Sequence, residues 1–226
     1  MEKTDETPNE NVIVFGGGLW YAICVEVLRM DARMMEAEAI VFDVGNVLLS
    51  FEPEKVLELL PAQGRDRMLN AMFGPSMLWS GFDLGLDGNE AVAERIAQAA
   101  GFPEAKDYAL DLLVRFPETM APLPLYGMLE ELRAMGKRLY GLATYPEPSF
   151  TLTCARFPLL VDALDGVIVS AREKVVKPSP EIFRLLQSRF RLDPAKTLFI
   201  DDSLANVEAA ARLGFQVWHY AGSGRL

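Results

Sequence analysis

From Ala39 onward, short apolar runs alternate with longer segments of helical periodicity. The runs predict strands over Ala39–Phe42, Arg138–Leu142, Gly166–Ser170, Thr197–Ile200 and Gln216–His219. Each run is apolar almost throughout, which is typical of strands that are buried on both faces of a parallel sheet. The main helices between the strands are predicted over Leu123–Met135, Pro180–Phe190 and Leu204–Leu213. This alternation predicts an α/β fold with a doubly wound, Rossmannoid parallel sheet, which binds ligands at the carboxyl ends of its strands.

One long segment interrupts the alternation. Between Phe51 and Pro122 the sequence predicts helices over Pro53–Leu60, Arg65–Phe73, Glu90–Ala100 and Glu104–Phe116. A helical block inserted directly after the first strand would cover that strand's carboxyl end, as a lid does. We therefore predict an α/β core made of residues 39–51 and 119–226, with a small helical cap over residues 52–118.

Residues 1–38 are predicted to form an extension outside this core. The segment Val12–Leu28 is largely apolar, but the residues before it are acidic, which argues against a secretory signal. Glu26 interrupts the apolar run, which argues against a membrane span. The stretch VIVFGGG resembles a phosphate-binding loop only weakly, because it lacks the GxGxxG spacing.

The charge balance limits the partners. The 226 residues carry a formal net charge of -10, and no cluster of Lys and Arg interrupts the acidic balance. We therefore expect a soluble globular protein that binds neither nucleic acid nor an anionic membrane surface. Cys24 and Cys154 are far apart and in no metal-binding spacing, which favours reduced thiols and a cytoplasmic location. A monomer and a homodimer are both compatible with the sequence.

Polar residues that could carry chemistry stand at the ends of the predicted strands or shortly after them. They are Asp43, the pair Ala143–Thr144, Lys177, and the pair Asp201–Asp202. Taken alone, Asp43 could be a turn or cap residue, Asp202 could cap a helix, and Lys177 could be a solvated lysine. Because the ends of parallel strands meet at one edge of a sheet, we expect these residues to share a site. Clustered carboxylates suit a hard cation such as Mg²⁺, and with Lys177 nearby Asp43 could attack phosphorus and form an aspartyl-phosphate.

Four segments resemble the motifs of the haloacid dehalogenase-like (HAD) hydrolase superfamily, namely VFDVGNVLL, YGLATYPEPSF, VVKPSPEIF and LFIDDSLANVEAA. The resemblance covers about residues 39–220 and points to subfamily I, the branch with a helical C1 cap after the first strand. It implies a HAD-like phosphatase that uses Mg²⁺ to hydrolyse a small phosphorylated metabolite. In this branch the cap closes over the site and supplies substrate selectivity.

The resemblance also implies a role for each motif position. Asp43 would be the nucleophile, and the backbone carbonyl of Gly45 would join it as a metal ligand. Lys177 would be the catalytic lysine that steadies the nucleophile and the phosphate. Asp201 would bind Mg²⁺, and Asp202 would support or complete the metal shell. The expected substrate-binding residues are Asn46, Ala143 and Thr144, and Asn206 belongs to the fourth motif.

The first motif departs from the usual phosphatase pattern. The family commonly carries a second Asp two residues after the nucleophile, which protonates the leaving group and then activates water, but this chain has Gly45. General acid–base help is typically worth about 10²–10⁴ in rate, so we expect poor alkoxide leaving groups to suffer most. The Gly45–Asn46 variant resembles a subgroup of sugar-phosphate phosphatases, which includes enzymes that act on glucose 1-phosphate.

The second motif departs as well. Where the family places Ser or Thr, this chain has Ala143 followed by Thr144. Either Thr144 takes over through a small shift of the loop, or the phosphate loses a hydroxyl contact worth about 1.5–3 kcal/mol. The two departures keep open a catalytically impaired HAD-fold protein that binds a phosphate ligand or has a regulatory role. A 2-haloacid dehalogenase is less favoured, because those enzymes generally lack the acidic pair Asp201–Asp202.

The predicted cap holds further candidates for substrate contact. They are Trp79, Phe82, Asp83 and Tyr108. Aromatic residues in a small helical bundle more often belong to its core, so none of them is singled out. His219, the one histidine of the sequence, ends the last predicted strand and is expected to be structural.

Overall fold

The computed structural model describes residues 31–221. Cys24, the stretch VIVFGGG and most of the predicted extension lie outside the described residues. The chain divides into two compact units, Met1–Met35 and Glu36–Leu226. Helix α2 (Ala32–Glu36) precedes the sheet in the chain. No helix within residues 31–221 is both long enough and apolar enough to cross a membrane.

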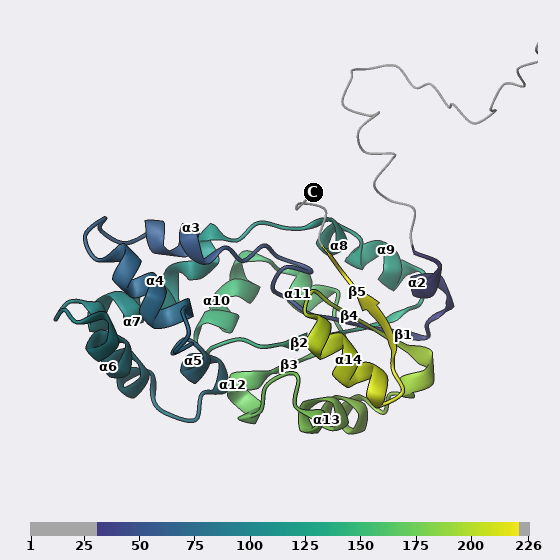
Figure 1. The fold of residues 1–226 in the computed structure, drawn as a ribbon. Coiled ribbons are helices and arrows are strands. Elements are labelled where there is room, and N and C mark those ends of the chain that lie inside the picture. Colours follow the sequence, from purple (N-terminus) through teal and green to yellow (C-terminus); the bar gives the residue numbers. More distant parts are fainter. Residues whose placement is uncertain (1–30, 222–226) are drawn as a thin grey trace, which may run out of the picture. The chain divides into compact units, whose positions relative to one another are not determined.

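A parallel sheet forms the centre of the second unit (Figure 1). Its strands are β1 (Ala39–Phe42), β2 (Arg138–Ala143), β3 (Gly166–Val169), β4 (Thr197–Asp201) and β5 (Gln216–His219). They lie in the order β3-β2-β1-β4-β5, and every neighbouring pair is parallel. The prediction of a doubly wound α/β sheet is therefore confirmed. All five predicted strands form, with ends that differ by at most one residue.

The strand order places the ends of β1 and β4 side by side. In the register of the sheet, Phe42 pairs with Gly141 of β2 and with Ile200 of β4. The next residues along the two chain segments, Asp43 directly after β1 and Asp201 at the end of β4, therefore lie at the same level. The chain connects β1 to β2 on one side and reaches β4 from β3 on the other, so the strand order reverses here. Such a reversal opens a crevice at the carboxyl ends of the strands.

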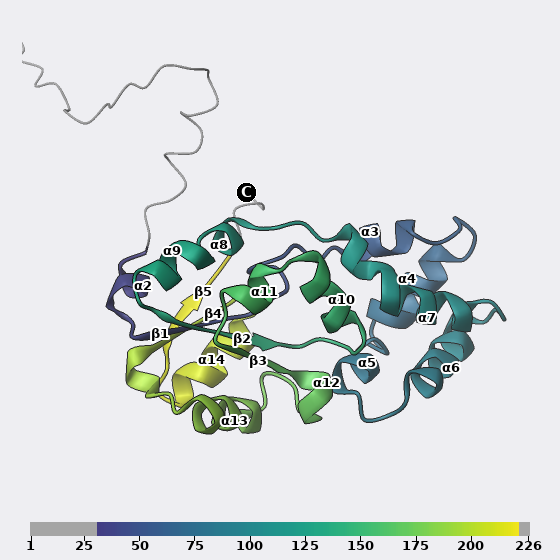
Figure 2. The ribbon, with the colours of Figure 1, turned by 180° about the vertical axis from the view of Figure 1, so that it is seen from behind.

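Helices cover both faces of this sheet. Figure 1 and Figure 2 show α8, α9 and α11 on one face and α13 and α14 on the other. Two of these helices precede β2 in the chain, α8 (Pro124–Gly127) and α9 (Leu129–Ala134). Those that follow β2, with the short 3-10 turn η2, are α10 (Ser149–Arg156), α11 (Leu159–Asp162), α12 (Ser170–Glu173), α13 (Pro180–Phe190), η2 (Pro194–Lys196) and α14 (Leu204–Arg212). Buried side chains of α13, such as Phe183, pack on strand residues such as Val41 and Phe199.

The prediction of one helix over Leu123–Met135 is wrong in one respect. The structure has two short helices, α8 and α9, which meet at Met128. Gly127 closes α8, and glycine weakens a helix interior by about 1 kcal/mol relative to alanine. The apolar periodicity continues across the break because Leu125, Leu129 and Leu132 are all buried, so periodicity alone did not reveal it.

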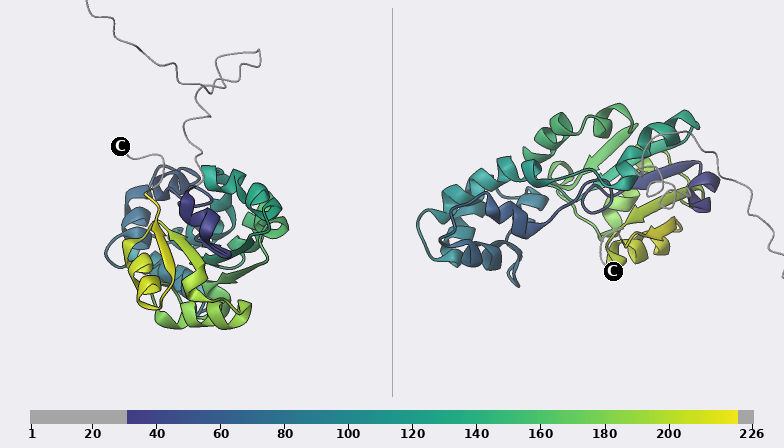
Figure 3. Two further views of the ribbon diagram at one scale, coloured as in Figure 1. Left: turned by 90° about the vertical axis from the view of Figure 1, so that its right-hand side faces the viewer. Right: turned by 90° about the horizontal axis from the view of Figure 1, so that it is seen from above.

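A block of helices, here named the helical insert, lies between β1 and β2 in the chain. It consists of α3 (Pro53–Glu58), α4 (Arg65–Phe73), α5 (Ser80–Leu84), α6 (Asn89–Ala100), α7 (Ala105–Arg115) and η1 (Phe116–Thr119). Figure 3 shows it beyond one end of the strands. The four helices predicted for this segment form as α3, α4, α6 and α7, while α5 was not predicted.

The two chain segments that join the insert to the sheet run side by side. Ser50 N donates to Ala121 O at 2.9 Å, and Leu123 N donates to Leu48 O at 2.9 Å. The insert therefore leaves and returns at one place. Its treatment as a separate cap, residues 52–118, stays a prediction, since residues 36–226 form one compact unit.

Candidate active site

Lys177 joins two carboxylates at the carboxyl edge of the sheet. Its Nζ lies 2.8 Å from Asp43 Oδ1 and 2.7 Å from Asp201 Oδ2. Asp43 directly follows β1, Asp201 ends β4, and Lys177 lies in the loop before α13. All three side chains are buried, so these ion pairs are shielded from solvent. The structure therefore brings together three residues that the sequence placed in one site.

The charges of the cluster shift its titration. Burial alone would lower the pKa of Lys177, but the carboxylates of Asp43 and Asp201 outweigh it and raise that pKa. Lys177 is therefore an ammonium ion at neutral pH. Burial raises the pKa of Asp43 to about 7, against the pull of Lys177, and the neighbouring negative charges of Asp201 and Asp202 add to the rise. The acidic side chains of the cluster thus carry more negative charge than one lysine balances.

The same three acids form a set of oxygen ligands. One oxygen each from Asp43, Asp201 and Asp202 lies within 4.8 Å of the others. Burial raises the pKa of Asp202, and the charge of Asp201 adds to the rise. Hard divalent cations such as Mg²⁺ take carboxylate and carbonyl oxygens, and a cation here would relieve the repulsion among the acids. The donor set therefore fits Mg²⁺.

Neighbouring residues fix the orientation of these acids. Asp201 Oδ1 accepts hydrogen bonds from Ser203 N and from Asn206 Nδ2, both at 2.9 Å. Asn46 Oδ1 accepts from Phe51 N at 3.0 Å, and the Asn46 side chain also hydrogen-bonds Asp202. Asn46, expected to bind substrate, thus ties the loop after β1 to Asp202. Asn206 gains a definite role, since it holds Asp201 in place.

His219 lies near the cluster but contacts no carboxylate in the described structure. A nitrogen of its exposed ring lies 2.9 Å from the backbone oxygen of Asp202. The contact supports the loop after β4, in keeping with the structural role predicted for it.

The residues of the first and second motifs border a cavity. Gly45 and Thr144 line it, whereas Ala143 is fully buried at the end of β2. Thr144 is the first residue after β2 and is partly exposed, so of this pair it is the residue that borders the cavity and carries a hydroxyl. A side chain at Gly45 would meet no atom within 4 Å of its Cβ. The absence of an acid at Gly45 is therefore not a consequence of crowding.

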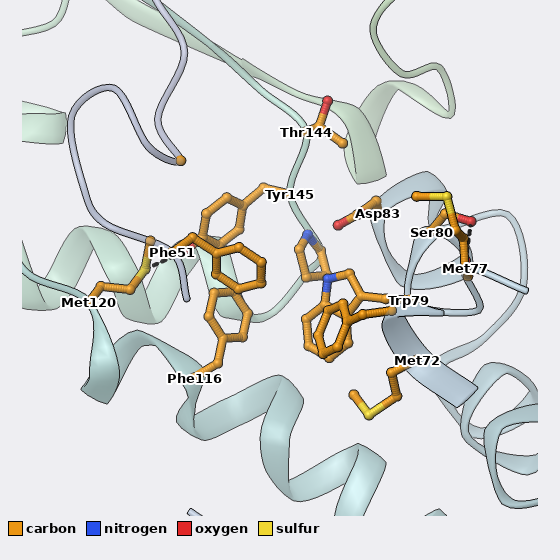
Figure 4. A pocket seen from close by; sticks show the side chains of 13 residues that line it. Phe51, Met72, Met77, Trp79, Ser80, Asp83, Phe116, Met120, Thr144 and Tyr145 are labelled. Atoms are coloured by element: carbon orange, nitrogen blue, oxygen red, sulfur yellow. Dashed lines mark hydrogen bonds between the residues drawn. The ribbon is translucent and has the colours of Figure 1, made fainter. Parts of the chain in front are cut away.

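This cavity, named here the aromatic cavity, has a volume of about 230 Å³ (Figure 4). Its lining residues are Gly45, Phe51, Met72, Phe73, Met77, Trp79, Ser80, Asp83, Phe116, Met120, Thr144, Tyr145 and Pro146. Most are aromatic residues or methionines, and they come from the helical insert and from the loops after β1 and β2. The aromatic cavity therefore begins at the loop that follows Asp43 and continues into an apolar space.

Trp79 is the centre of its aromatic wall. The Trp79 ring lies with its centroid 5.3 Å from that of Phe73 and 5.5 Å from that of Phe116. Of the four candidates in the insert, Trp79 and Asp83 line the cavity. Phe82 is buried behind Trp79, and Tyr108 instead pairs with Phe102.

Sequence reasoning named only Gly45, Trp79, Asp83 and Thr144 among the lining residues and missed the rest, of which Phe51, Met120 and Tyr145 are examples. Tyr145 Oη lies 2.7 Å from Thr153 Oγ1 and 3.1 Å from Met120 Sδ, which fixes the ring against the cavity. Phe51 and Met120 flank the insert on the two segments that run side by side, a proximity that no local sequence pattern reveals.

Asp83 is an acid in apolar surroundings. It keeps some exposure toward the open cavity, while protein atoms surround its carboxyl group. The loss of hydration raises the pKa of Asp83 to about 7, against the pull of a hydrogen bond from Trp79. Its backbone oxygen accepts a hydrogen bond from the buried Ser170 Oγ at 2.7 Å, which ties α5 to the start of α12.

Comparisons with known proteins find relatives in sequence and in fold. The chain is 25% identical over 190 residues to the sesquiterpene phosphatase AstK of Aspergillus oryzae, a match that covers 82% of this chain and 91% of the relative. Among solved structures it is similar to the HAD family enzyme BT-2542 of Bacteroides thetaiotaomicron in complex with magnesium and inorganic phosphate. The TM-score is 0.66 at 21% identity, over 84% of this chain and 96% of that one.

The fold is shared more widely. L-2-haloacid dehalogenase of Xanthobacter autotrophicus, with chloropropionic acid covalently bound, matches with a TM-score of 0.58 at 22% identity, over 80% of this chain and 76% of that one. The family model of the haloacid dehalogenase-like hydrolases matches residues 37–214, a span that contains β1, the insert, Lys177 and both acids at the end of β4. Because this family model matches most of the chain, the chain belongs to the haloacid dehalogenase-like hydrolases.

Proposed function

We propose that the chain is a Mg²⁺-dependent phosphatase that hydrolyses a phosphate monoester through an aspartyl-phosphate on Asp43. The observation that carries the proposal is the position of Lys177, 2.8 Å from Asp43 and 2.7 Å from Asp201, beside a third carboxylate. A relative named as a sesquiterpene phosphatase and a structural neighbour crystallised with magnesium and phosphate support it.

The residues of the chain divide the work. Asp43 supplies the attacking oxygen, and Lys177 lowers the pKa of Asp43 against the effect of burial and offers an ammonium group to the phosphate. Asp43, Asp201, Asp202 and the Gly45 carbonyl would hold Mg²⁺, which when bound supplies positive charge for the phosphate oxygens. Thr144 offers a hydroxyl at the edge of the same space. Water then cleaves the aspartyl-phosphate and regenerates the Asp43 carboxylate.

We further propose that the organic group of the substrate is apolar. The aromatic cavity adjoins Gly45 and offers rings and thioethers in place of the many hydrogen-bond partners that a sugar requires. A cavity of about 150 Å³ lined by apolar side chains can bind benzene, so about 230 Å³ suits a somewhat larger group. A sugar phosphate, which the Gly45–Asn46 variant favours, is the competing substrate.

Two other functions remain as alternatives. A catalytically impaired phosphate binder would keep the ion pairs but lack turnover, and Gly45 and Ala143 favour it. A dehalogenase would need no metal, and the acidic pair Asp201–Asp202 argues against it.

The first experiment measures phosphate release, with and without Mg²⁺, by the wild type and by Asp43→Asn. The substrates are p-nitrophenyl phosphate, glucose 1-phosphate, glucose 6-phosphate and n-alkyl phosphates of increasing length. Turnover that needs both Mg²⁺ and Asp43 is expected. No release from any substrate, by a folded protein that binds Mg²⁺, would instead favour the non-catalytic binder.

The alkyl series tests the apolar group. One buried methylene contributes about 0.8 kcal/mol, so kcat/KM should rise up to about fourfold per carbon until the cavity is full. Met77→Ser should flatten this rise, since Met77 lines the cavity but is 62% exposed and removable without loss of the core. The matched control is Leu86→Ser, because Leu86 is 65% exposed on the same insert and does not line the cavity. A preference for glucose phosphates, unchanged by Met77→Ser, would contradict the apolar proposal.

A further inference from the structure

Cleavage of an alkyl phosphate needs a proton for the departing oxygen. The acids beside the nucleophile are committed, because Asp201 binds Lys177, Ser203 and Asn206, and Asp202 belongs to the ligand set. Gly45 carries no side chain. An alkoxide is too basic to leave unprotonated at a useful rate, so a proton donor must face the space that holds the organic group.

Asp83 lies in that space. It is the carboxylic acid among the described residues that line the aromatic cavity, and the cavity also includes Gly45 and Thr144. Figure 4 shows its carboxyl group directed toward the other side chains that line the cavity. The Ser170 hydroxyl holds the Asp83 backbone oxygen at 2.7 Å, and the Trp79 side chain hydrogen-bonds the carboxyl group. The acid is therefore held in place and lines the space in which the leaving group is expected.

We propose that Asp83 of the helical insert is the general acid and base of this enzyme, in place of the side chain that Gly45 lacks. This inference rests on the proposed phosphatase function. In the first step an Asp43 oxygen bonds to phosphorus, the bond from phosphorus to the ester oxygen breaks, and Asp83 gives its proton to that oxygen. In the second step water attacks phosphorus, Asp83 takes a proton from the water, and the bond from phosphorus to Asp43 breaks. Alcohol and phosphate leave, and both acids return to their starting forms.

The surroundings of Asp83 suit both halves of the cycle. The pKa of about 7 keeps a large share of the carboxyl group protonated at neutral pH and still lets it accept a proton. Tyr145, from the loop after β2, is the nearby titratable group, and burial holds its phenol neutral. Lys174, at the end of α12, binds the Gly85 carbonyl, and Arg95 of α6 pairs with Asp87. No described cation is thus paired with the Asp83 carboxyl group.

The test compares Asp83→Asn with the wild type on two substrates, octyl phosphate and p-nitrophenyl phosphate, in saturating Mg²⁺. The value of kcat/KM reports steps up to loss of the leaving group, and p-nitrophenolate leaves without a proton. We expect kcat/KM to fall about 10²–10⁴-fold with octyl phosphate and only a few-fold with p-nitrophenyl phosphate. A burst of p-nitrophenol should precede slow turnover, because the second step has lost its base. Asp87→Asn, the same change at an exposed site of the insert, should leave kcat/KM unchanged for both substrates.

Equal loss with both substrates, without a burst, would overturn the role of Asp83 and leave the proposed function intact. Absence of turnover by the wild type would overturn the proposed function, and this inference with it. The wild type gives an independent test if Asp83→Asn fails to fold. Its kcat/KM for octyl phosphate should fall as pH rises through about 7, while that for p-nitrophenyl phosphate should show no such fall. A shared alkaline limb would count against Asp83.

The free energy of unfolding of the metal-free protein, measured against pH, gives a test of Asp83 that does not depend on activity. The folded state raises the pKa of Asp83 above its unfolded value of 3.8, so the wild type binds this proton more tightly when folded. Its stability should fall relative to Asp83→Asn as pH rises from about 4 to about 7 and should level off above that range. Parallel pH profiles of the two proteins would show that Asp83 titrates normally, and would overturn the proposal.

Discussion

At the residue scale, Lys177 stabilises the buried carboxylates at the carboxyl edge of the sheet when no metal is bound. Two buried carboxylates contact its ammonium group, and a third lies close by. Removal of one member of a buried ion pair typically costs about 3–5 kcal/mol, because the remaining charge is left without a partner. Lys177→Met should therefore destabilise the metal-free protein by this order at pH 8. The loss should shrink at lower pH, where Asp43 takes up a proton.

Urea unfolding followed by tryptophan fluorescence measures this change. Lys196→Met is the matched control, because Lys196 pairs with Glu38 through exposed side chains. A similar small effect from both substitutions would mean that the buried ion pairs contribute little to stability.

Gly45 gives the second prediction at this scale. It has no positive φ, and a Cβ would meet nothing within 4 Å, so Gly45→Asp should change the free energy of unfolding by less than about 1 kcal/mol. Added to Asp83→Asn, Gly45→Asp should raise kcat/KM for octyl phosphate at least tenfold above that of the single variant. Gly45→Asn fills the same space without an acid and should recover nothing. Equal recovery by both substitutions would contradict a need for a proton donor.

The residues that the sequence could predict are those that stand in motifs beside strand ends. Asp43, Lys177 and Asp201 fall into this class, because register alone brings them to one edge. Asp83 could be named as a candidate but not assigned a role. Its surroundings depend on Ser170 and Tyr145, which lie at least 60 positions away in the chain, and no local pattern records such contacts.

At the element scale, the link between α5 and α12 shapes the aromatic cavity. The fully buried Ser170 Oγ accepts from Tyr145 N at 2.9 Å and donates to Asp83 O at 2.7 Å. Ser170→Ala leaves both backbone groups without this partner and should destabilise the protein by about 1–3 kcal/mol. It should also raise KM for octyl phosphate, since Tyr145 and Asp83 both line the cavity. Mg²⁺ affinity should stay unchanged, because the acid cluster is not touched.

Chemical unfolding, steady-state kinetics and Mg²⁺ titration check the three parts separately. The control is Thr119→Ala, whose hydroxyl bonds to Phe116 O in its own turn at 2.8 Å. A fall in Mg²⁺ affinity as large as the rise in KM would indicate a general disturbance of the fold instead.

Elements were predictable where burial enforces a period. The strands follow from short continuous apolar runs, and the helices α4 and α13 follow from apolar periodicity over several turns, with the predicted bounds. The short helices α5, α11 and α12 did not follow, because four or five residues hold too little of a helical period. The cavity is built from such pieces and from loops, so its shape could not be derived from the sequence.

At the scale of the whole molecule, the chain is acidic and its acids are unevenly placed. The formal net charge is -10, and most of the acidic side chains in the described ion pairs are partly or largely exposed. Asp43 and Asp201 instead lie buried beside one lysine. A divalent cation could therefore stabilise the protein in two ways, by screening the surface or by binding the buried cluster, and the two are separable.

Specific binding makes stability depend on Mg²⁺ concentration as RT ln(1 + [Mg²⁺]/Kd), which is about 2.7 kcal/mol at a hundredfold excess over Kd. We expect the wild type to gain stability along this curve in thermal unfolding, at constant ionic strength set with NaCl. Asp202→Asn should shift the curve to higher Mg²⁺ concentration, because it removes one anionic ligand and leaves the Lys177 ion pairs in place. Glu208→Gln, an equal change of charge at an exposed site on α14, should leave the curve where it is. An equal response of all three proteins would show that Mg²⁺ acts on the acidic surface, and would remove the metal from the site formed by Asp43, Asp201 and Asp202.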